Sequence, residues 1–269
     1  MFPPVTSIIA LVGPTAVGKT KLGVQLAKSL QSEVISIDSL QCYKDGSIIS
    51  AKVKPEEADG IVHHLVDYVD AQDEPHTFIN DAIDCIRDIH SRGRVPILVG
   101  GSTSLTIPIL QAAVEDGKTP FIIILGDTAS SLETRIRKRV DEMVQEGLLR
   151  ELFGLYKLEK ALLEGPDFSR GIWKVIGYRE FYPCFTMPRM DREQFSELMA
   201  QCLARLKTET VLYANKQVDW ACDTLVPFLQ TMKIPYVRLQ VDGQTTGENV
   251  MAKATRSYAS ALQDNVELL

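Results

Sequence analysis

Eight consecutive residues near the start of the chain have the types and spacing of a phosphate-binding loop, or P-loop. They follow the pattern G-x-x-x-x-G-K-[ST] and are Gly13, Pro14, Thr15, Ala16, Val17, Gly18, Lys19 and Thr20. In such a loop the backbone amides face a phosphate, the following helix contributes the positive end of its dipole, and the lysine reaches the outer phosphate. The hydroxyl of Thr20 is a candidate ligand for Mg²⁺. The run predicts a site for a di- or triphosphate without specifying which compound carries it.

A carboxylate, Asp38, ends the next apolar run, residues 33–38. The C-terminal ends of parallel strands line the ligand crevice, so Asp38 is expected to face whatever lies beside the phosphates. Spacing alone leaves its role open between substrate chemistry, capping of the next helix and water-mediated binding of Mg²⁺. A second turn of small residues, 100–104, follows a later apolar run; its hydroxyls are expected to cap a helix rather than touch substrate.

Two arginines, Arg135 and Arg139, lie one turn apart on the same face of a predicted helix. Such a pair is often no more than a solvated helix face. The functional alternative is an arginine that reaches over the P-loop and neutralises a leaving phosphate group.

The pattern of apolar runs predicts the elements that position these residues. Short β-branched runs at 5–12, 33–37, 95–99 and 121–125 alternate with helical periodicity at 19–30, 76–90 and 103–113. This alternation predicts an α/β fold, a P-loop NTPase-like parallel sheet flanked by helices. Residues 130–230 are almost entirely helical in pattern, with breaks at 165–166 and 183–188, and a strand at 236–241 and a helix at 247–263 return to the sheet.

These elements predict two units. Residues 1–128 together with about 232–269 form the α/β core, and about 129–231 form a small helical appendage that serves as a lid or acceptor-side region. The segment 45–60, rich in charged residues and glycine, is predicted to be an exposed functional loop.

Composition narrows the class of partner. The 269 residues include 29 basic and 35 acidic side chains, a net charge of −6, so the basic excess typical of polynucleotide binding is absent. No apolar run is long enough to cross a membrane, and the first residues suggest a buried strand rather than a signal peptide, so a cytoplasmic protein is expected. The five cysteines form no C-x-x-C pair and are expected to be reduced, mostly buried thiols.

Taken in order, several segments resemble the isopentenyltransferase family, P-loop enzymes that move a dimethylallyl group from dimethylallyl diphosphate to the N6 amine of adenine. The segments that carry the resemblance are GPTAVGKT, SIDSLQCY, SAKVKPEE, VHHLVD, VPILVGGSTSL, RIRKRVDEMVQEGLLREL, FSRGIWKVIGYREF and TVLYANKQVDW. Each is modest alone, but the ordered set is specific and runs through most of the chain.

The resemblance implies a role for each matching residue. The P-loop would grip the diphosphate of the prenyl donor, with Lys19, Arg139 and Mg²⁺ on Thr20 stabilising the departing diphosphate. Asp38 matches the catalytic aspartate, the base for the adenine amine. Further matches lie near the reacting centre (Thr15, Ser50 and Lys52) or on the acceptor side (Tyr213 and Gln217). Ser50 and Lys52 are predicted to bind the acceptor together with Asp38, Tyr213, Gln217 and the residue at position 176.

Departures from the family pattern bear on the acceptor. In tRNA-modifying members some sixty or more residues separate the Gly-Gly turn from the arginine helix, whereas here only about thirty lie between Gly101 and Arg135. This favours a free adenine nucleotide (AMP, ADP or ATP) over tRNA as the acceptor, and hence synthesis of a cytokinin precursor. A monomer is expected. Compact adenylate-type members have an acceptor-binding aspartate where this chain has Ile176. An aromatic, non-nucleotide acceptor therefore stays open as an alternative, as does a small-molecule kinase.

Overall fold

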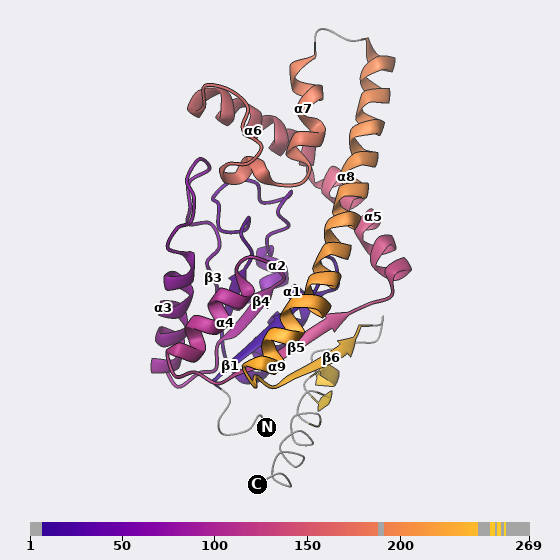
Figure 1. Ribbon diagram of the computed structural model, residues 1–269. Coiled ribbons are helices and arrows are strands. Elements are labelled where there is room, and N and C mark those ends of the chain that lie inside the picture. Colours follow the sequence, from indigo (N-terminus) through magenta and orange to yellow (C-terminus); the bar gives the residue numbers. More distant parts are fainter. Residues whose placement is uncertain (1–6, 188–190, 242–247, 251, 254–255, 257–269) are drawn as a thin grey trace, which may run out of the picture.

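A six-stranded parallel sheet forms the centre of the described chain. The computed structural model describes residues 7–187, 191–241, 248–250, 252–253 and 256 (Figure 1). Its strands are β1 (Ile8–Val12), β2 (Val34–Ile37), β3 (His63–His64), β4 (Ile97–Gly100), β5 (Pro120–Gly126) and β6 (Tyr236–Gln240). Their order is β3-β2-β4-β1-β5-β6, with every pairing parallel. The predicted α/β fold is confirmed.

Both faces of the sheet are buried, which explains why the strands are apolar throughout. Along β1, for example, Ile8 and Ala10 belong to one hydrophobic cluster, and Ile9 and Leu11 belong to the other. The first cluster packs under α3 (Phe78–Ser91) and α4 (Thr106–Glu115); the second packs under α1 (Lys19–Leu30). The carboxyl ends of the strands therefore meet at one edge of a rigid layer.

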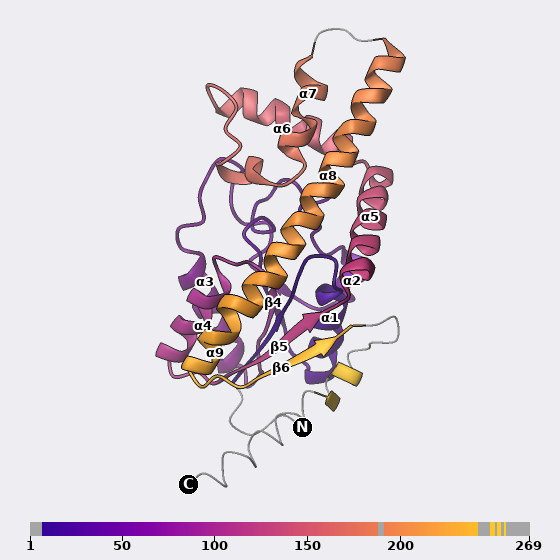
Figure 2. The ribbon, with the colours of Figure 1, turned by 45° about the vertical axis from the view of Figure 1, so that its right-hand side comes forward.

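Helices predominate between β5 and β6. They are α5 (Ala129–Glu146), α6 (Leu148–Leu162), the 3₁₀ turn η1 (Gly171–Lys174), α7 (Tyr178–Thr186), α8 (Arg192–Trp220), the π turn η2 (Ala221–Leu225) and α9 (Val226–Thr231). Figures 1 and 2 show α6, α7 and the first half of α8 beyond the sheet, while the second half of α8 runs back along it. A helix of 29 residues is about 43 Å long, so α8 connects the two regions.

The helical region shares its hydrophobic core with the sheet and is not a separate appendage. Leu152, Trp173, Phe181 and Leu206 belong to the same hydrophobic cluster as the strand residue Ile8. Continuous packing of this kind fixes the position of the helices over the strand ends.

Several sequence expectations need correction. The two-residue strand β3 was not predicted, because a run of two is too short to show periodicity. Pro183 lies inside α7 instead of breaking it, and the segment 45–60 is only partly exposed, since Ile49 and Lys52 are both 7% exposed. The short helix α2 (Pro55–Ala58) also lies in that segment. Most of the predicted helix 247–263 lies outside the described residues.

Two further expectations concern the cysteines and the membrane. All five cysteines are free thiols; Cys42 and Cys202 are buried and Cys222 is exposed. Within the described part of the chain, no helix has the length and apolar character needed to span a bilayer.

A buried carboxylate at the start of β2 ties this strand to its neighbours. Glu33 is 5% exposed and accepts hydrogen bonds from Arg92 and from Arg94 (2.8 Å), while His64 Nε2 lies 2.7 Å from its Oε2. Hydrogen bonds from Arg92, opposed by burial, lower the pKa of Glu33 from 4.5 to about 2. The ionised form of Glu33 thus stabilises the fold.

Glu33→Gln is expected to lower the free energy of unfolding by about 2 kcal/mol at pH 7, a value reduced because both arginines are partly exposed. A lowered native pKa contributes stability that is complete above pH 4.5 and lost as the pH falls through about 2. Urea unfolding at several pH values measures this, and the difference from wild type should shrink below pH 4. The exposed Asp84→Asn should change stability by less than about 0.5 kcal/mol; an equal loss in both variants would contradict the assignment.

Candidate active site

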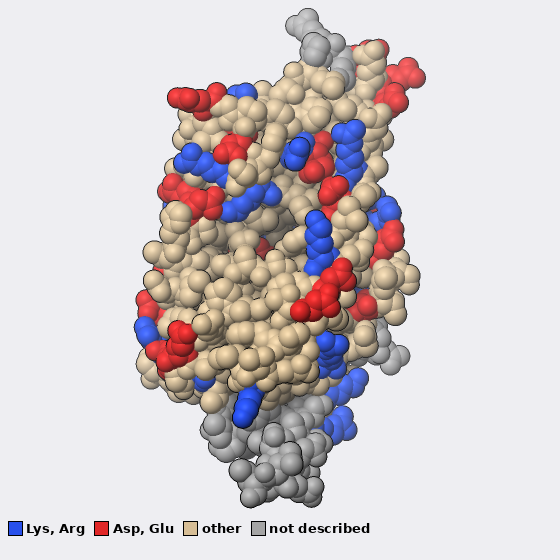
Figure 3. All heavy atoms as spheres, in the orientation of Figure 1, with Lys and Arg blue, Asp and Glu red and all other residues tan. Residues whose placement is uncertain are grey.

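A cavity of about 810 Å³ lies at the carboxyl ends of β2 and β4, beneath the helical region. Figure 3 shows a hollow in the middle of this face, with Lys and Arg side chains on its rim. Most of the residues proposed from the sequence line the cavity: Thr15, Ala16, Gly18, Lys19, Thr20, Asp38, Ser50, Lys52, Arg139, Tyr213 and Gln217. Four do not line it: Gly13, Pro14, Val17 and Ile176. The first three lie in the P-loop behind its surface.

The P-loop joins β1 to α1, as predicted. Gly18 has φ of 97°, a left-handed conformation that a glycine adopts without strain, and it directly precedes the first residue of α1. The first turn of a helix has amides without helical partners, and Lys19 and Thr20, the first two residues of α1, line the cavity. This arrangement suits an anion.

The Lys19 ammonium lies within the loop that it follows. Its Nζ donates a hydrogen bond to the carbonyl of Pro14 (2.7 Å). Burial lowers the pKa of Lys19 from 10.5 to about 7; the charge of Asp38 raises it and that of Arg139 lowers it further. A bound anion would oppose this shift and raise the pKa of Lys19 again.

Asp38 reaches the cavity from the turn after β2. Its Oδ1 accepts hydrogen bonds from the amides of Leu40 (2.9 Å) and Gln41 (3.4 Å), so it caps a turn rather than a helix. Both of these bonds end on Oδ1, which leaves Oδ2 for a ligand. Its charge also acts on Lys19, Arg139 and Tyr213, so the four side chains share one electrostatic environment.

The two arginines of α5 serve different sides of the P-loop. Arg139 donates to the hydroxyl of Thr15 (3.1 Å) and faces the cavity. Arg135 instead pairs with the buried carboxylate of Asp127 (2.7 Å) and approaches the carbonyl of Val17 (3.4 Å). Arg139 thus corresponds to the proposed diphosphate ligand, while Arg135 supports the loop from behind.

Ser50 and Lys52 lie in the loop that faces the P-loop, and the structure shows Lys52 engaged in holding that loop. Its Nζ donates to the carbonyls of Tyr43 (2.5 Å) and Asp45 (3.1 Å) and pairs with Asp67 (2.5 Å). The ammonium therefore has no proton to spare for a substrate. These bonds give Lys52 a structural role, and its part in acceptor binding stays a prediction.

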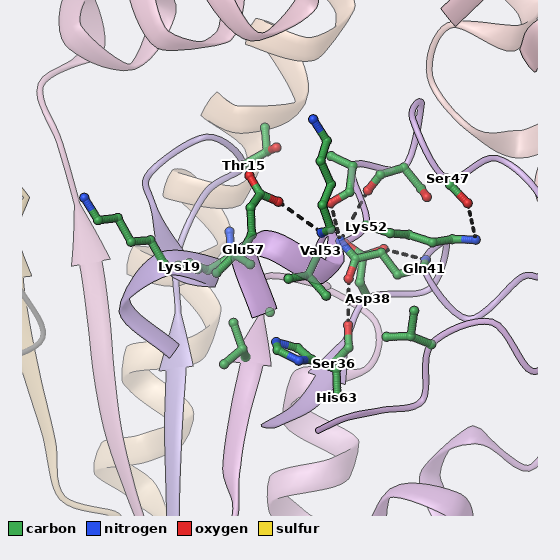
Figure 4. A pocket seen from close by; sticks show the side chains of 18 of the residues that line it. Thr15, Lys19, Ser36, Asp38, Gln41, Ser47, Lys52, Val53, Glu57 and His63 are labelled. Atoms are coloured by element: carbon green, nitrogen blue, oxygen red, sulfur yellow. Dashed lines mark hydrogen bonds between the residues drawn. The ribbon is translucent and has the colours of Figure 1, made fainter. Parts of the chain in front are cut away.

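Two residues that the sequence analysis did not single out fix the same loop. Gln41 accepts from Ser36 Oγ (2.9 Å) and donates to the carbonyls of Ser50 and Ala51 (3.3 and 3.1 Å); Figure 4 shows Ser36, Asp38 and Gln41 together. Glu151 of α6 accepts from the amides at positions 48 and 49, each at 2.8 Å. Gln41 belongs to the segment SIDSLQCY and could have been chosen from it, whereas no local pattern marks Glu151.

The acceptor-side predictions have mixed outcomes. Tyr213 lines the cavity, and burial together with the charge of Asp38 raises the pKa of Tyr213 to about 12. Ile176 instead packs against the main hydrophobic cluster, so the structure gives it no contact with the cavity. Gln217 reaches the cavity wall, but its amide group bonds to two backbones, Thr15 N and Gly101 O, each at 2.8 Å.

Comparison with known proteins places this site in a family. A model described as IPP transferase matches residues 41–116 and 106–223, well over half of the chain. The chain belongs to the IPP transferase family. The predicted resemblance to isopentenyltransferases, prenyl-transferring enzymes, is therefore confirmed.

Relatives within the IPP transferase family carry different functional descriptions. A bifunctional cytokinin biosynthesis protein of Fusarium pseudograminearum is 44% identical over 254 residues, which are 94% of this chain but 52% of that protein. The chain thus spans about half the length of this relative. A tRNA dimethylallyltransferase of Saccharomyces cerevisiae is 29% identical over 294 residues, 82% of this chain and 68% of that one.

A solved structure supports the fold of this IPP transferase. A eukaryotic dimethylallyltransferase described as acting on tRNA superposes with a TM-score of 0.76 at 24% identity, covering 97% of this chain and 80% of the other.

The low pKa of Lys19 predicts that diphosphate binding takes up a proton. Bound phosphate charge raises this pKa above its free value of about 7, so affinity should be highest below pH 7 and decline above it. Titration calorimetry at pH 8 in buffers of different ionisation enthalpy should show uptake of about one proton per site. Lys19→Arg keeps a permanent charge and should abolish that share of the uptake, although diphosphate itself titrates in both proteins. Equal uptake by wild type and K19R would contradict the prediction.

Proposed function

We propose that this chain transfers a dimethylallyl group from dimethylallyl diphosphate to the N6 amine of a free adenine nucleotide, the reaction that forms a cytokinin precursor. Family membership supports the prenyl transfer. P-loop residues and the carboxylate of Asp38 line one cavity, which supports a site with a donor side at the P-loop and an acceptor side at Asp38.

The donor side consists of groups that stabilise a leaving diphosphate. The amides of the first turn of α1, the Lys19 ammonium and the Arg139 guanidinium would surround the anion. Charge on the diphosphate grows as the bond to the prenyl carbon breaks, so these preorganised donors act most strongly in the transition state.

Mg²⁺ fits this donor side. It commonly takes only one or two protein ligands and completes its coordination with phosphate oxygens and water. Among the described residues no group of three His, Cys, Asp or Glu forms a separate metal cage, so Thr20, which lines the cavity, is the residue that would hold the ion. When bound, Mg²⁺ would neutralise charge on the diphosphate.

Asp38 is the proposed base. The exocyclic amine of adenine is a weak nucleophile, because its lone pair is delocalised into the ring, and a carboxylate in hydrogen-bond reach of its N–H can accept the proton as the new bond forms. Oδ1 is held by the turn amides of residues 40 and 41, so Oδ2 would face the amine. The Tyr213 side chain lines the same part of the cavity and would flank the acceptor.

The choice of a free nucleotide as acceptor rests on a segment that the tRNA enzymes contain and this chain lacks. The alignment with the yeast enzyme has 294 positions, although 82% of this chain is about 220 residues, so more than 70 positions have no counterpart here. The alignment with the Fusarium cytokinin protein has almost no such unmatched positions. The two segments matched by the family model overlap at 106–116. This overlap lies between Gly101 and Arg135, the interval that is shorter here than in tRNA-modifying members. A free nucleotide loses no contacts by this deletion, whereas a tRNA would lose most of them.

The other hypotheses have less support. The aromatic acceptor depended on Ile176, which lies outside the cavity lining. Membership of a prenyl-transferring family removes the argument for a small-molecule kinase.

The test is a competition among acceptors. With dimethylallyl diphosphate and Mg²⁺, AMP, ADP or ATP should be prenylated at least about a hundredfold more efficiently than an unmodified tRNA, a difference of roughly 2.7 kcal/mol in transition-state binding. Mass spectrometry of the products, compared with simple phenols, measures kcat/KM for each acceptor.

Asp38→Asn tests the proposed base. It preserves the shape of the side chain but removes the base, so turnover should fall by about 10²–10⁴ while inorganic diphosphate still binds. Efficient modification of tRNA, or of a phenol in preference to every nucleotide, would contradict the proposed acceptor. Near-normal turnover by D38N would exclude Asp38 as the base.

A further inference from the structure

A single glutamine on α8 bridges the two backbone segments that form the floor of the cavity. Gln217 is 5% exposed. Its Oε1 accepts the N–H of Thr15 in the P-loop (2.8 Å), and its Nε2 donates to the carbonyl of Gly101 in the turn after β4 (2.8 Å). Reversing the amide would place donor against donor and acceptor against acceptor, so these two partners determine its orientation.

The two backbones joined by Gln217 are also in close contact. A Cβ atom added to Gly101 would lie 2.3 Å from the carbonyl oxygen of Gly13 and 2.9 Å from Nε2 of Gln217. The amide of Gly13 also donates to the carbonyl of Gly100 (3.3 Å). The start of the P-loop and the turn after β4 thus form one layer, which Gln217 closes from the side of α8.

Thr15 is consequently held from two helices. Its amide is taken by Gln217 of α8, and its hydroxyl accepts from Arg139 of α5 (3.1 Å). Because the Thr15 amide already donates to Gln217, it cannot also donate to a diphosphate. The neighbouring amides at the start of α1 are left to bind it, and their direction depends on where Thr15 is fixed.

The same helix face also borders the acceptor side. Tyr213 precedes Gln217 by one helical turn, an i,i+4 pair on one face, and both line the cavity. One rigid helix therefore connects the wall of the acceptor site with the shape of the donor loop.

We propose that Gln217 is a positioning residue for the diphosphate: it sets the shape of the P-loop through Thr15 and does not bind the acceptor. The proposal rests on the proposed function for the identity of the donor, but its direct readout is the binding of inorganic diphosphate. Removing the side chain would leave the part-buried N–H of Thr15 and the buried carbonyl of Gly101 without this partner, and the loop would have to move to satisfy them.

Gln217→Met tests this with the full chain, since methionine has a similar length and no comparable hydrogen bonds. In the presence of Mg²⁺, titration calorimetry should show inorganic diphosphate binding about tenfold more weakly than to wild type. The dissociation constant for AMP should change by less than about twofold. In kinetics, KM for the prenyl donor should rise while KM for the nucleotide stays constant.

Thr106→Val is the matched control. Thr106 is fully buried and donates to the carbonyl of Ser102 (2.6 Å) in the same turn, but within the described chain it forms no hydrogen bond with the P-loop and does not line the cavity. It should lower Tm as Q217M does, yet leave diphosphate affinity within about twofold. If Q217M does not fold, Gln217→Asn, which keeps the amide but is one methylene too short to reach both Thr15 and Gly101, should still weaken diphosphate by about tenfold.

Two outcomes would overturn the inference, and a third bears only on the proposed function. Unchanged diphosphate affinity with weaker AMP binding would make Gln217 an acceptor ligand. An equal loss of diphosphate affinity in T106V would make the effect a general loss of stability. Failure of the enzyme to prenylate any nucleotide would contradict the proposed function alone, because the diphosphate titrations would remain interpretable.

Discussion

A loop that binds phosphate through its own amides must be held open by other parts of the protein, because those amides cannot also bond to one another. Here the outer support comes from several directions. Gln217 fixes the Thr15 amide, Arg139 fixes its hydroxyl, and Arg135 approaches the loop from the Asp127 side. The helices that supply these residues share packing with the sheet. The folded protein thus holds the loop in its binding shape before a ligand arrives, which is what electrostatic preorganisation requires.

A second constraint is the balance of charge in the cavity. Burial lowers the pKa of both Lys19 and Arg139, and the charge of Arg139 lowers that of Lys19 further; the carboxylate of Asp38 offsets part of this effect on each. A diphosphate would supply the missing negative charge on one side and leave Asp38 free to accept a proton on the other. The loop around Ser50, clamped by Gln41, Lys52 and Glu151, closes the opposite wall.

The sequence was informative where chemistry and local geometry coincide. The P-loop, the strand before it and the helix 19–30 follow from a contiguous motif with its own periodicity, and Asp38 follows from its place at a strand end. Lys52, Gln217 and Ile176 were assigned to the acceptor side by resemblance, yet two of them bond to backbone and one packs in the core. Residue type alone does not show whether a polar group faces a ligand or a carbonyl; that depends on long-range packing. Glu151, which caps amides about a hundred residues away in sequence, has no local signal at all.

The most direct test of this account is a crystal structure with inorganic diphosphate, Mg²⁺ and AMP bound together. Diphosphate oxygens are expected on the amides of residues 18–20 and on Lys19 and Arg139, with the adenine N6 within hydrogen-bond distance, about 3 Å, of Asp38. Gln217 would keep its bonds to Thr15 and Gly101. An adenine ring bound away from Asp38, or AMP phosphate occupying the P-loop in place of diphosphate, would contradict it.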